Sequence, residues 1–202
     1  MKLILFCGPS GSGKTTIVHH LLNNNAQLRF SVSATTRKMR SNEIDGVDYH
    51  FITVDEFKSK IAANEFVEWE EVYEGGFYGT LKPEVDKLLN EGKVVVFDVD
   101  VEGGLNIKKI YGEKLLAVFV QPPSIEALHK RLKARSSETE ESLKRRVAKA
   151  EHELTYANKF DKIIVNDNLE TALWQAQKLL DDFIAGRIVP ARPVTAQFNG
   201  KQ

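Results

Sequence analysis

Eight residues near the N-terminus have the types and spacing of a phosphate-binding loop. They read Gly8-Pro9-Ser10-Gly11-Ser12-Gly13-Lys14-Thr15. Two glycines that bracket four residues can turn backbone N–H groups inward as an anion nest at the start of a helix. Lys14 would then place its charge at the β- and γ-phosphates, and the Thr15 hydroxyl would ligate Mg²⁺. The loop predicts a nucleoside triphosphate site; a glycine-rich turn that only joins a strand to a helix is the alternative.

Two arginines and two tyrosines downstream could form a second anion site. Arg37 and Arg40 lie in the stretch 33–40, and Tyr49 and Tyr78 follow. Guanidinium groups present forked donors that suit a phosphate, and tyrosine hydroxyls add neutral donors. Such a site would bind an acceptor molecule, so that the γ-phosphate is transferred to this acceptor rather than to water. A solvated basic loop would have the same composition.

Arginines recur in a helical stretch rich in charge. Arg131 and Arg135 lie four residues apart on one helix face, where like charges repel by about 0.2–0.5 kcal/mol unless an anion arrives. In the next helix Arg145 has Glu141 four residues before it, whereas Arg146 has no acidic residue at helical spacing. We expect Arg145 to be solvated and Arg146 to await a ligand, although a solvated charge run would look alike.

Buried strands alternate with helices over most of the chain. Continuous apolar runs predict strands at residues 3–7, 94–97, 115–120 and 163–165. Helical patterns are found at 14–22, 83–90, 102–110, 124–135, 138–156 and 169–184, with Ser124 as an N-cap. This rhythm predicts an α/β fold built on a parallel sheet.

Three regions depart from that rhythm. Residues 33–82 carry short strands at 49–52 and 66–69 around a helix near 55–63, which indicates an inserted α+β subdomain. The core then comprises residues 1–32, 83–123 and 157–186. Residues 124–156 include a solvated or mobile helical hairpin, and the polar stretch 187–202 is expected to be a flexible tail.

Composition narrows the class of protein. The 202 residues carry 28 Lys+Arg and 28 Asp+Glu, so the basic surplus of a general nucleic-acid binder is absent. No apolar run approaches the roughly 18 residues of a membrane span, and no signal-peptide pattern is visible. The single cysteine, Cys7, fits a reducing compartment and an inert core position. His19 and His20 are adjacent and cannot share a helix face, so no zinc cluster is expected. We expect a cytoplasmic protein without nucleic-acid or membrane partners.

These segments, in this order, resemble nucleoside monophosphate kinases and specifically the guanylate kinase family. The resemblance spans about residues 2–184, and its most specific parts are Thr35-Thr36-Arg37 and Asp48-Tyr49-His50-Phe51. It also includes Phe66-Val67-Glu68-Trp69, Tyr78-Gly79-Thr80 and Asp98-Val99-Asp100. The resemblance implies a parallel-sheet P-loop kinase core, an inserted GMP-binding subdomain and a helical lid over ATP.

The resemblance also implies residue roles. It assigns to the GMP phosphate Arg37, Arg40, Tyr49 and Tyr78. It assigns to the guanine edge Ser33, Glu68, Thr80 and Asp100, with Gly79 among the GMP-binding residues and Asp98 near the shared phosphate and metal region. It assigns to ATP the loop through Thr16, together with Arg131 and an adenosine contact from Asn166 and Asp167. It assigns to phosphoryl transfer Lys14, Arg40, Arg135 and Arg146.

The chemistry of Glu68 agrees with a guanine site. Guanine presents N1–H and N2–H₂ donors, and an ionised carboxylate only accepts hydrogen bonds. Adenine would offer Glu68 an acceptor nitrogen and leave a buried charge unpaired. The resemblance therefore implies that MgATP and GMP give ADP and GDP. A solvent-facing glutamate on an amphipathic strand is the alternative for this position.

Some positions depart from the family pattern, and two other functions stay open. Met39 and Asn42 replace a common Pro and Gly near Arg40, Glu102 replaces a common Gln, and Ser136 replaces a common Gly after the second lid arginine. A non-catalytic relative that binds peptides would be expected to lose nucleotide-site residues, which are present here. A kinase for another phosphorylated acceptor is disfavoured by Ser33 and Glu68. Whether the chain forms a homo-oligomer is left open.

Overall fold

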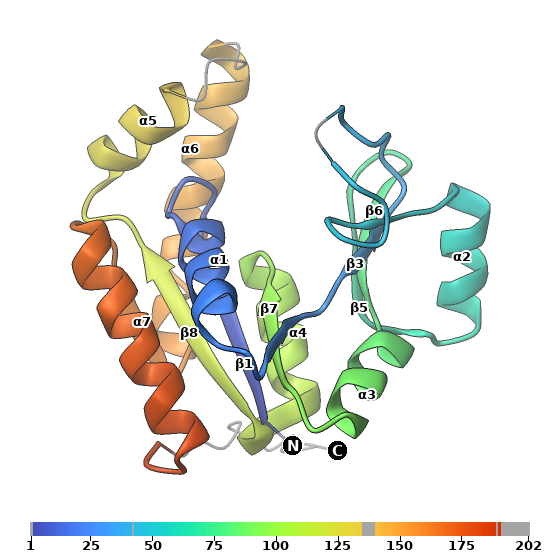
Figure 1. The fold of residues 1–202 in the computed structure, drawn as a ribbon. Coiled ribbons are helices and arrows are strands. Elements are labelled where there is room, and N and C mark those ends of the chain that lie inside the picture. The colour runs from blue at the N-terminus through green and yellow to red at the C-terminus, as the bar shows by residue number, and fades with distance from the viewer. Residues whose placement is uncertain (1, 42, 135–139, 189, 191–202) are drawn as a thin grey trace, which may run out of the picture.

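The computed structural model describes residues 2–41, 43–134, 140–188 and 190. The predicted α/β class is confirmed. A five-stranded parallel sheet has the order β2-β7-β1-β8-β9, and a separate four-stranded mixed sheet has the order β4-β3-β6-β5 (Figure 1). Helices cover both faces of the first sheet, and the second sheet stands beside it on the side of α3.

The five-stranded sheet is built from the apolar runs that the sequence singled out. Its strands are β1 (Lys2–Cys7), β2 (Leu28–Phe30), β7 (Val94–Asp98), β8 (Leu115–Gln121) and β9 (Lys162–Val165). Strand β1 lies between β7 and β8, and its residues Leu3 to Cys7 are completely buried. Because both faces of a central parallel strand are covered, an unbroken apolar run is what such a strand requires.

Two strands of this sheet differ from expectation. Strand β2 was not predicted, because three residues with Arg29 in the middle give no apolar run. Strand β9 was predicted to be buried, but only Ile164 is, while Ile163 and Val165 are 47% and 45% exposed. The prediction was wrong there because β9 is an edge strand, and alternate side chains of an edge strand can face solvent.

The helices form two layers around the sheet. One layer contains α1 (Lys14–Asn24) and α7 (Leu169–Ile184), and the other contains α3 (Lys82–Asn90) and α4 (Val101–Tyr111). The predicted bounds of α7 are confirmed, and those of the other three differ by one or two residues. Asp100 caps α4 by accepting a hydrogen bond from the Gly103 N–H at 2.9 Å, which fixes this carboxylate at the carboxyl edge of the sheet.

The second sheet is an insertion between β2 and α3. Its strands are β3 (Ser33–Thr35), β4 (His50–Phe51), β5 (Phe66–Tyr73) and β6 (Gly76–Leu81), with helix α2 (Val54–Ala62) packed on one side. Neither β3 nor β6 contains an unbroken apolar run, so these strands were missed. The core of this unit is small and aromatic, since Phe57 stacks on Phe66 and Phe77 with ring centres 4.3 and 5.3 Å apart.

Helices α5 (Ile125–Lys133) and α6 (Glu140–Leu154) stand together at the end of the molecule above the loop after β1 (Figure 1). Ser124 caps α5 as predicted, because its Oγ accepts from the Ala127 N–H at 3.1 Å. The expected solvated hairpin has an apolar core of its own, formed by Leu128, Leu132, Leu143 and Ala150. The sequence analysis missed this core because the apolar residues, although they recur at helical spacing, are outnumbered by charged residues in this stretch.

Short 3-10 turns, η1 (Gly112–Lys114) and η2 (Ala157–Lys159), lead into β8 and β9. Within the described part of the chain, no helix combines the length and hydropathy needed to cross a membrane. The tail expected over 187–202 falls almost entirely outside the described residues, as do Asn42, Arg135 and Ser136.

Replacement of Phe57 by alanine should weaken the inserted sheet. The side chain is completely buried between two aromatic rings, so Phe57→Ala should lower the free energy of unfolding by about 3–5 kcal/mol. Urea unfolding monitored by circular dichroism measures the change. Ile110→Ala, at a position that is 54% exposed on α4, is the control and should change the value by less than about 0.5 kcal/mol. Equal effects of the two substitutions would contradict this packing.

Candidate active site

The loop of residues 8–15 joins β1 to α1 in the expected way, and it lies tightly against its surroundings. Gly8 has φ 137°, and a Cβ built there would be 2.1 Å from the backbone oxygen of Val120 in β8. Gly13 is the N-cap of α1 with φ 96°, and its Cβ would be 2.2 Å from Nδ2 of Asn166. Gly8 therefore demands glycine for conformation and for space, and Gly13 demands it for conformation and lies tightly against the Asn166 side chain.

Asn166 holds this loop from the far side of β8. Its buried side chain donates from Nδ2 to the backbone oxygen of Ser12 at 2.8 Å. Its own backbone oxygen accepts from Nη2 of Arg131 at 2.8 Å, while Nη1 of Arg131 is buried without a hydrogen-bond partner among the described residues. The exposed Asp167 follows. The structure thus gives Asn166 a role in shaping the loop, and the expected adenosine contact stays a prediction.

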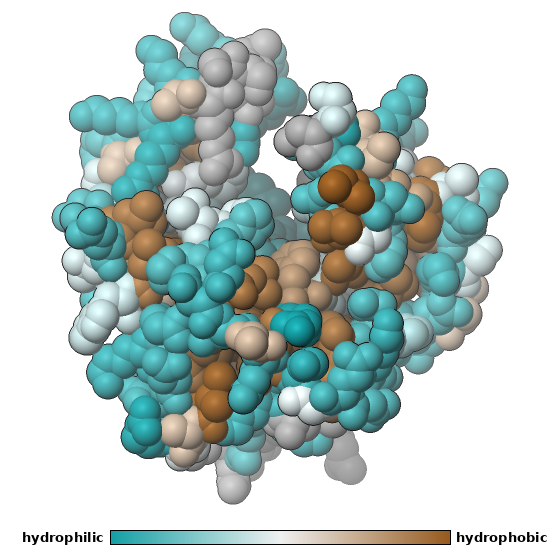
Figure 2. Space-filling view, viewed as in Figure 1, coloured by the Kyte–Doolittle hydropathy of each residue, from teal (hydrophilic) through white to brown (hydrophobic). Residues whose placement is uncertain are grey.

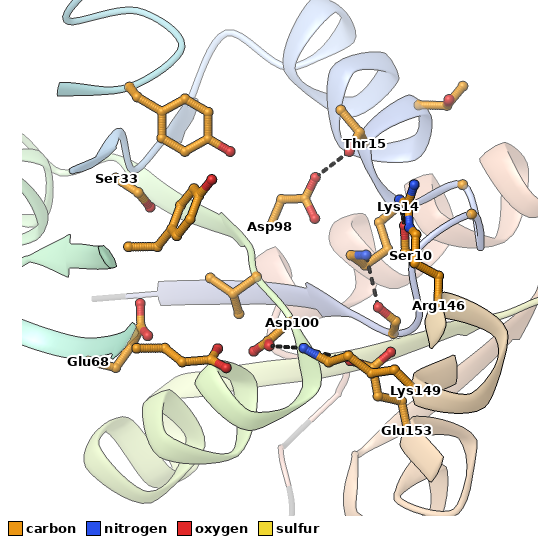
Figure 3. Close-up of a pocket in the computed structure, with 18 of the residues that line it drawn as sticks. Ser10, Lys14, Thr15, Ser33, Glu68, Asp98, Asp100, Arg146, Lys149 and Glu153 are labelled. Carbon is orange, nitrogen blue, oxygen red and sulfur yellow. Dashed lines mark hydrogen bonds and ion pairs between the residues drawn. The ribbon is translucent and has the colours of Figure 1, made fainter. Parts of the chain in front are cut away.

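A cavity of about 530 Å³ opens between the loop, the second sheet and helix α6 (Figure 3). Figure 2 shows the hollow between the α5–α6 end of the molecule and the inserted unit. Predicted site residues that line it include Ser10, Lys14, Thr15, Ser33, Tyr49, Glu68, Tyr78, Asp98, Asp100 and Arg146. Segments separated by more than one hundred residues thereby meet at the carboxyl edge of the parallel sheet.

Positive groups gather at the loop end of the cavity. Lys14 donates from Nζ to the backbone oxygen of Gly8 at 2.9 Å, and Thr15 donates from Oγ1 to Oδ2 of Asp98 at 2.7 Å. The prediction that Arg146 lacks a partner was wrong, since its guanidinium donates to Oγ of Ser10 in the loop. The partner lies on another element, which helical spacing within α6 could not reveal.

The expected phosphate-binding arginines lie beyond the cavity lining. Arg37 donates from Nη1 and Nη2 to the two carboxylate oxygens of Glu43 at 2.7 and 2.5 Å, and its guanidinium lies 5.0 Å from the ring centre of Tyr49. The hydrogen bond to Arg37 lowers the pKa of Glu43 to about 2. The Arg40 backbone N–H also donates to Glu43, and the Arg40 side chain is exposed. The sequence analysis did not identify Glu43, although a carboxylate so close in sequence to both arginines is a natural ion-pair partner for them.

Residues expected to read the base lie together at the opposite end. Glu68 in β5 accepts at Oε1 from Oγ1 of the completely buried Thr80 at 2.7 Å, and Ser33 pairs with Thr80 across β3 and β6. A Cβ at Gly103 would lie 3.1 Å from Oε2 of Glu68, so glycine there leaves room for this carboxyl group. Burial raises the pKa of Glu68, and the nearby Asp100 adds to that rise against the hydrogen bond from Thr80.

Three charged residues of the cavity were not predicted. Glu70 is two residues beyond Glu68 on β5, and α6 contributes Lys149 and the buried Glu153. Lys149 Nζ lies 3.5 Å from Oδ2 of Asp100 and 3.8 Å from Oε1 of Glu153, so Asp100 sits between Glu68 and Lys149 (Figure 3). Alternation along β5 placed Glu70 on the same face as Glu68, and that period of two was the missed signal.

The predicted core position of Cys7 is confirmed. Cys7 is completely buried in β1, and burial raises the pKa of its thiol. No group of three or more His, Cys, Asp or Glu side chains within the described ranges could hold a metal ion by itself.

These features define a P-loop phosphotransferase of the nucleoside monophosphate kinase class. A parallel sheet carries the glycine-rich loop after its first strand, and the second sheet faces that loop across one cavity. The guanylate kinase family model matches residues 1–183. A guanylate kinase of Bacteroides fragilis is 55% identical over 183 residues, which cover 91% of this chain and 90% of that protein. One from Porphyromonas gingivalis is 50% identical over 185 residues, covering 91% and 98%. The crystal structure of guanylate kinase from Anaplasma phagocytophilum superposes with a TM-score of 0.72 at 27% identity, covering 91% of this chain and 85% of that one. The chain belongs to the guanylate kinase family of ATP:GMP phosphotransferases.

Replacement of Gly8 by alanine should disrupt the loop more than the same replacement at another glycine with positive φ. Gly8→Ala brings a Cβ against the backbone of β8, whereas Gly92→Ala, at φ 72°, meets nothing within 4 Å. We expect Gly92→Ala to cost about 1 kcal/mol of stability and leave ATP binding intact. Gly8→Ala should lower ATP affinity at least about tenfold, as measured by calorimetry on folded protein. Identical ATP affinities in the two variants would show that the close approach to Val120 does not matter.

Proposed function

We propose that the cavity transfers the γ-phosphoryl group of MgATP to GMP, giving ADP and GDP. One observation carries this proposal: a single cavity joins a phosphate-binding loop containing Lys14 to a pair of acceptor-side carboxyl groups, Glu68 and Asp100. Phosphate groups of both substrates would meet at the loop end, and the acceptor base would lie at the carboxyl-rich end. The proposal includes the subdomain and lid boundaries predicted from the sequence, 33–82 and 124–156.

The triphosphate would be bound by the loop of residues 8–16. Backbone N–H groups at the N-terminus of α1 and the ammonium of Lys14 supply the positive potential that polyphosphates require. Arg131, whose Nη1 has no hydrogen-bond partner among the residues that the structure describes, would contact the adenosine side together with the Asn166-Asp167 corner. The Thr15 hydroxyl would hold Mg²⁺, and its hydrogen bond to Asp98 keeps that hard oxygen donor oriented. The ion supplies charge neutralisation at the β- and γ-phosphates.

The acceptor phosphate would be bound by Arg37, Arg40, Tyr49 and Tyr78. Tyr49 and Tyr78 contact edge to face with ring centres 6.0 Å apart and both line the cavity. Arg37 already forms a bidentate pair with Glu43, so a phosphate would have to share or replace that carboxylate. The exposed Arg40 is available to fold over the phosphate once it arrives.

Guanine would be selected by acceptors at the other end. Glu68 would accept from N1–H and N2–H₂, Asp100 from the amino group, and Ser33 and Thr80 would complete the edge with their hydroxyls. Adenine would present an acceptor where these carboxylates also accept, so it would leave them buried without partners. This mismatch would disfavour AMP.

Phosphoryl transfer itself would depend on positioning and positive charge. A loose transition state needs donors at the equatorial oxygens, and Lys14, Arg40 and Arg146 would supply them together with Arg135, which lies outside the described residues. Closure of α5 and α6 over ATP would exclude water and so prevent hydrolysis. No group in this scheme must act as a strong general base.

The two neighbouring arginines of α6 offer a matched test of transition-state contact. Arg146 is half-buried and contacts the loop, whereas Arg145 is exposed. Arg146→Ala should lower kcat by about 10³-fold because it removes a cation from the transferring group. Arg145→Ala should lower it by less than about threefold. Steady-state assays measure kcat for both variants, provided that their thermal stability is unchanged. Equal losses of kcat would contradict the assignment of Arg146 to the transferring group.

The base preference is tested at Glu68. Glu68→Gln replaces an acceptor with an amide that also donates, at a charge-assisted contact of about 1.5–3 kcal/mol. We expect kcat/KM for GMP to fall about ten- to a hundredfold or more, with AMP unchanged or slightly improved. Glu71→Gln, at an exposed position of the same strand, is the control and should leave both values unaltered. A GMP/AMP ratio that does not move in Glu68→Gln would mean that Glu68 does not contact the base.

A further inference from the structure

We propose that Gly103 of helix α4 is a positioning residue that determines the base specificity of the acceptor site. The space left by its missing side chain sets where the Glu68 carboxyl group lies relative to that of Asp100. The inference rests on the proposed function, which assigns these two carboxyl groups to guanine. It goes beyond that function because Gly103 has no side chain that could contact the base itself.

Gly103 lies where the start of α4 packs against strand β5. A Cβ built on Gly103 would lie 3.1 Å from Oε2 of Glu68 and 3.4 Å from Oδ1 of Asp100. In Figure 3 the labelled Glu68 and Asp100 side chains approach each other along one wall of the cavity. A C–H group and an oxygen rest about 3.3–3.6 Å apart, so alanine at this position would push the Glu68 carboxyl group away. The displacement would be a few tenths of an ångström.

Hydrogen bonds already hold both carboxyl groups in place. Oε1 of Glu68 accepts from Oγ1 of Thr80 at 2.7 Å, and Thr80 is completely buried. Oδ1 of Asp100 accepts from the Gly103 N–H at 2.9 Å, a bond that alanine would keep because it has the same backbone donor. Displacement of Glu68 therefore strains its bond to Thr80 and changes its position relative to Asp100, which stays with α4.

Backbone conformation does not explain glycine at this position. Gly103 and Gly104 are both buried in α4, and neither has a positive φ. Alanine is the better helix former, so each glycine needs a reason in its packing. A Cβ at Gly104 would meet apolar atoms of the core, 3.2 Å from Cβ of Cys7 and 3.2 Å from Cδ2 of Leu5. The three atoms nearest to a Cβ at Gly103 belong instead to the carboxyl groups of Glu68 and Asp100.

A displaced Glu68 would weaken the contact with guanine and leave the other substrate contacts intact. Guanine offers N1–H and N2–H₂ as adjacent donors, and hydrogen bonds weaken steeply when their angles are poor. The phosphates of GMP and ATP would bind at the loop end of the cavity, away from Gly103. A contact made equally in the ground state and the transition state affects KM and leaves kcat unchanged.

The test is Gly103→Ala, with Gly104→Ala at the next position as the matched control. At saturating MgATP we expect Gly103→Ala to raise KM for GMP about tenfold, to change kcat less than about threefold and to leave KM for ATP unaltered. The ratio of kcat/KM for GMP to that for AMP should fall by about the same factor of ten. Gly104→Ala should keep these values within about twofold of the wild type, whatever its effect on Tm. A GMP/AMP ratio that is unchanged in Gly103→Ala, or that falls equally in both variants, would overturn the inference.

A double-mutant cycle separates contact with Glu68 from general distortion of α4. Glu68→Asp shortens the side chain by one methylene and withdraws the carboxyl group from position 103. In that background Gly103→Ala should change KM for GMP by less than about threefold. Distortion of the helix predicts the same tenfold rise in both backgrounds, which would contradict a role through Glu68.

Folding is checked by Tm, and GMP affinity is measured separately by titration calorimetry. If Gly103→Ala alone does not fold, the combination with Glu68→Asp should fold, because the shorter side chain removes the close contact. A double variant that also fails to fold would contradict the inference. Wild-type protein that transfers no phosphoryl group to GMP would refute the proposed function, whereas unchanged selectivity of Gly103→Ala beside an active wild type would refute only the role of Gly103.

Discussion

The close contact between the loop of residues 8–15 and strand β8 is the constraint on which the rest of the site depends. At Gly8 the backbone of β8 leaves no room for a Cβ, and at Gly13 the side chain of Asn166 lies close against the loop. This contact fixes the loop at the carboxyl edge of the sheet, where parallel strands all end. Asp98 reaches Thr15 of the loop because β7 ends beside β1 at that edge.

Both signs of charge line the cavity, although the chain as a whole is neutral. Lys14 and Arg146 lie at the loop end together with Asp98, and Glu68 and Asp100 lie at the other end, where Lys149 approaches Asp100. Several cations already have partners, as in Arg37 with Glu43 and Lys149 with Asp100. Substrate binding is consequently an exchange of partners, and its net free energy is smaller than the number of new contacts suggests.

Sequence patterns predicted those helices, strands and loops whose structure is determined by residues close to one another in the sequence. Apolar runs located β1 and β8, helical periodicity located α7 to the residue, and glycine spacing located the loop. Strands β2, β3 and β6 were missed because they show no hydrophobic pattern. The first two are only three residues long and contain polar residues, and β6 contains two glycines. Glu43 and Glu70 were missed although the sequence carried a signal for each, namely closeness to the two arginines and the period of two along β5. The Ser10 partner of Arg146 could not be predicted, since the fold alone brings these two residues together. The subdomain boundaries and the substrate roles stay predictions.

The central claim is that the carboxyl-rich end of the cavity selects guanine by its donors. A coupled assay that presents wild-type protein with MgATP and either GMP, AMP, CMP or UMP tests it most directly. We expect kcat/KM for GMP to exceed that for each of the other three by at least about a hundredfold, because only guanine offers two adjacent donors to acceptor-only groups. A value for AMP comparable to that for GMP would contradict the account.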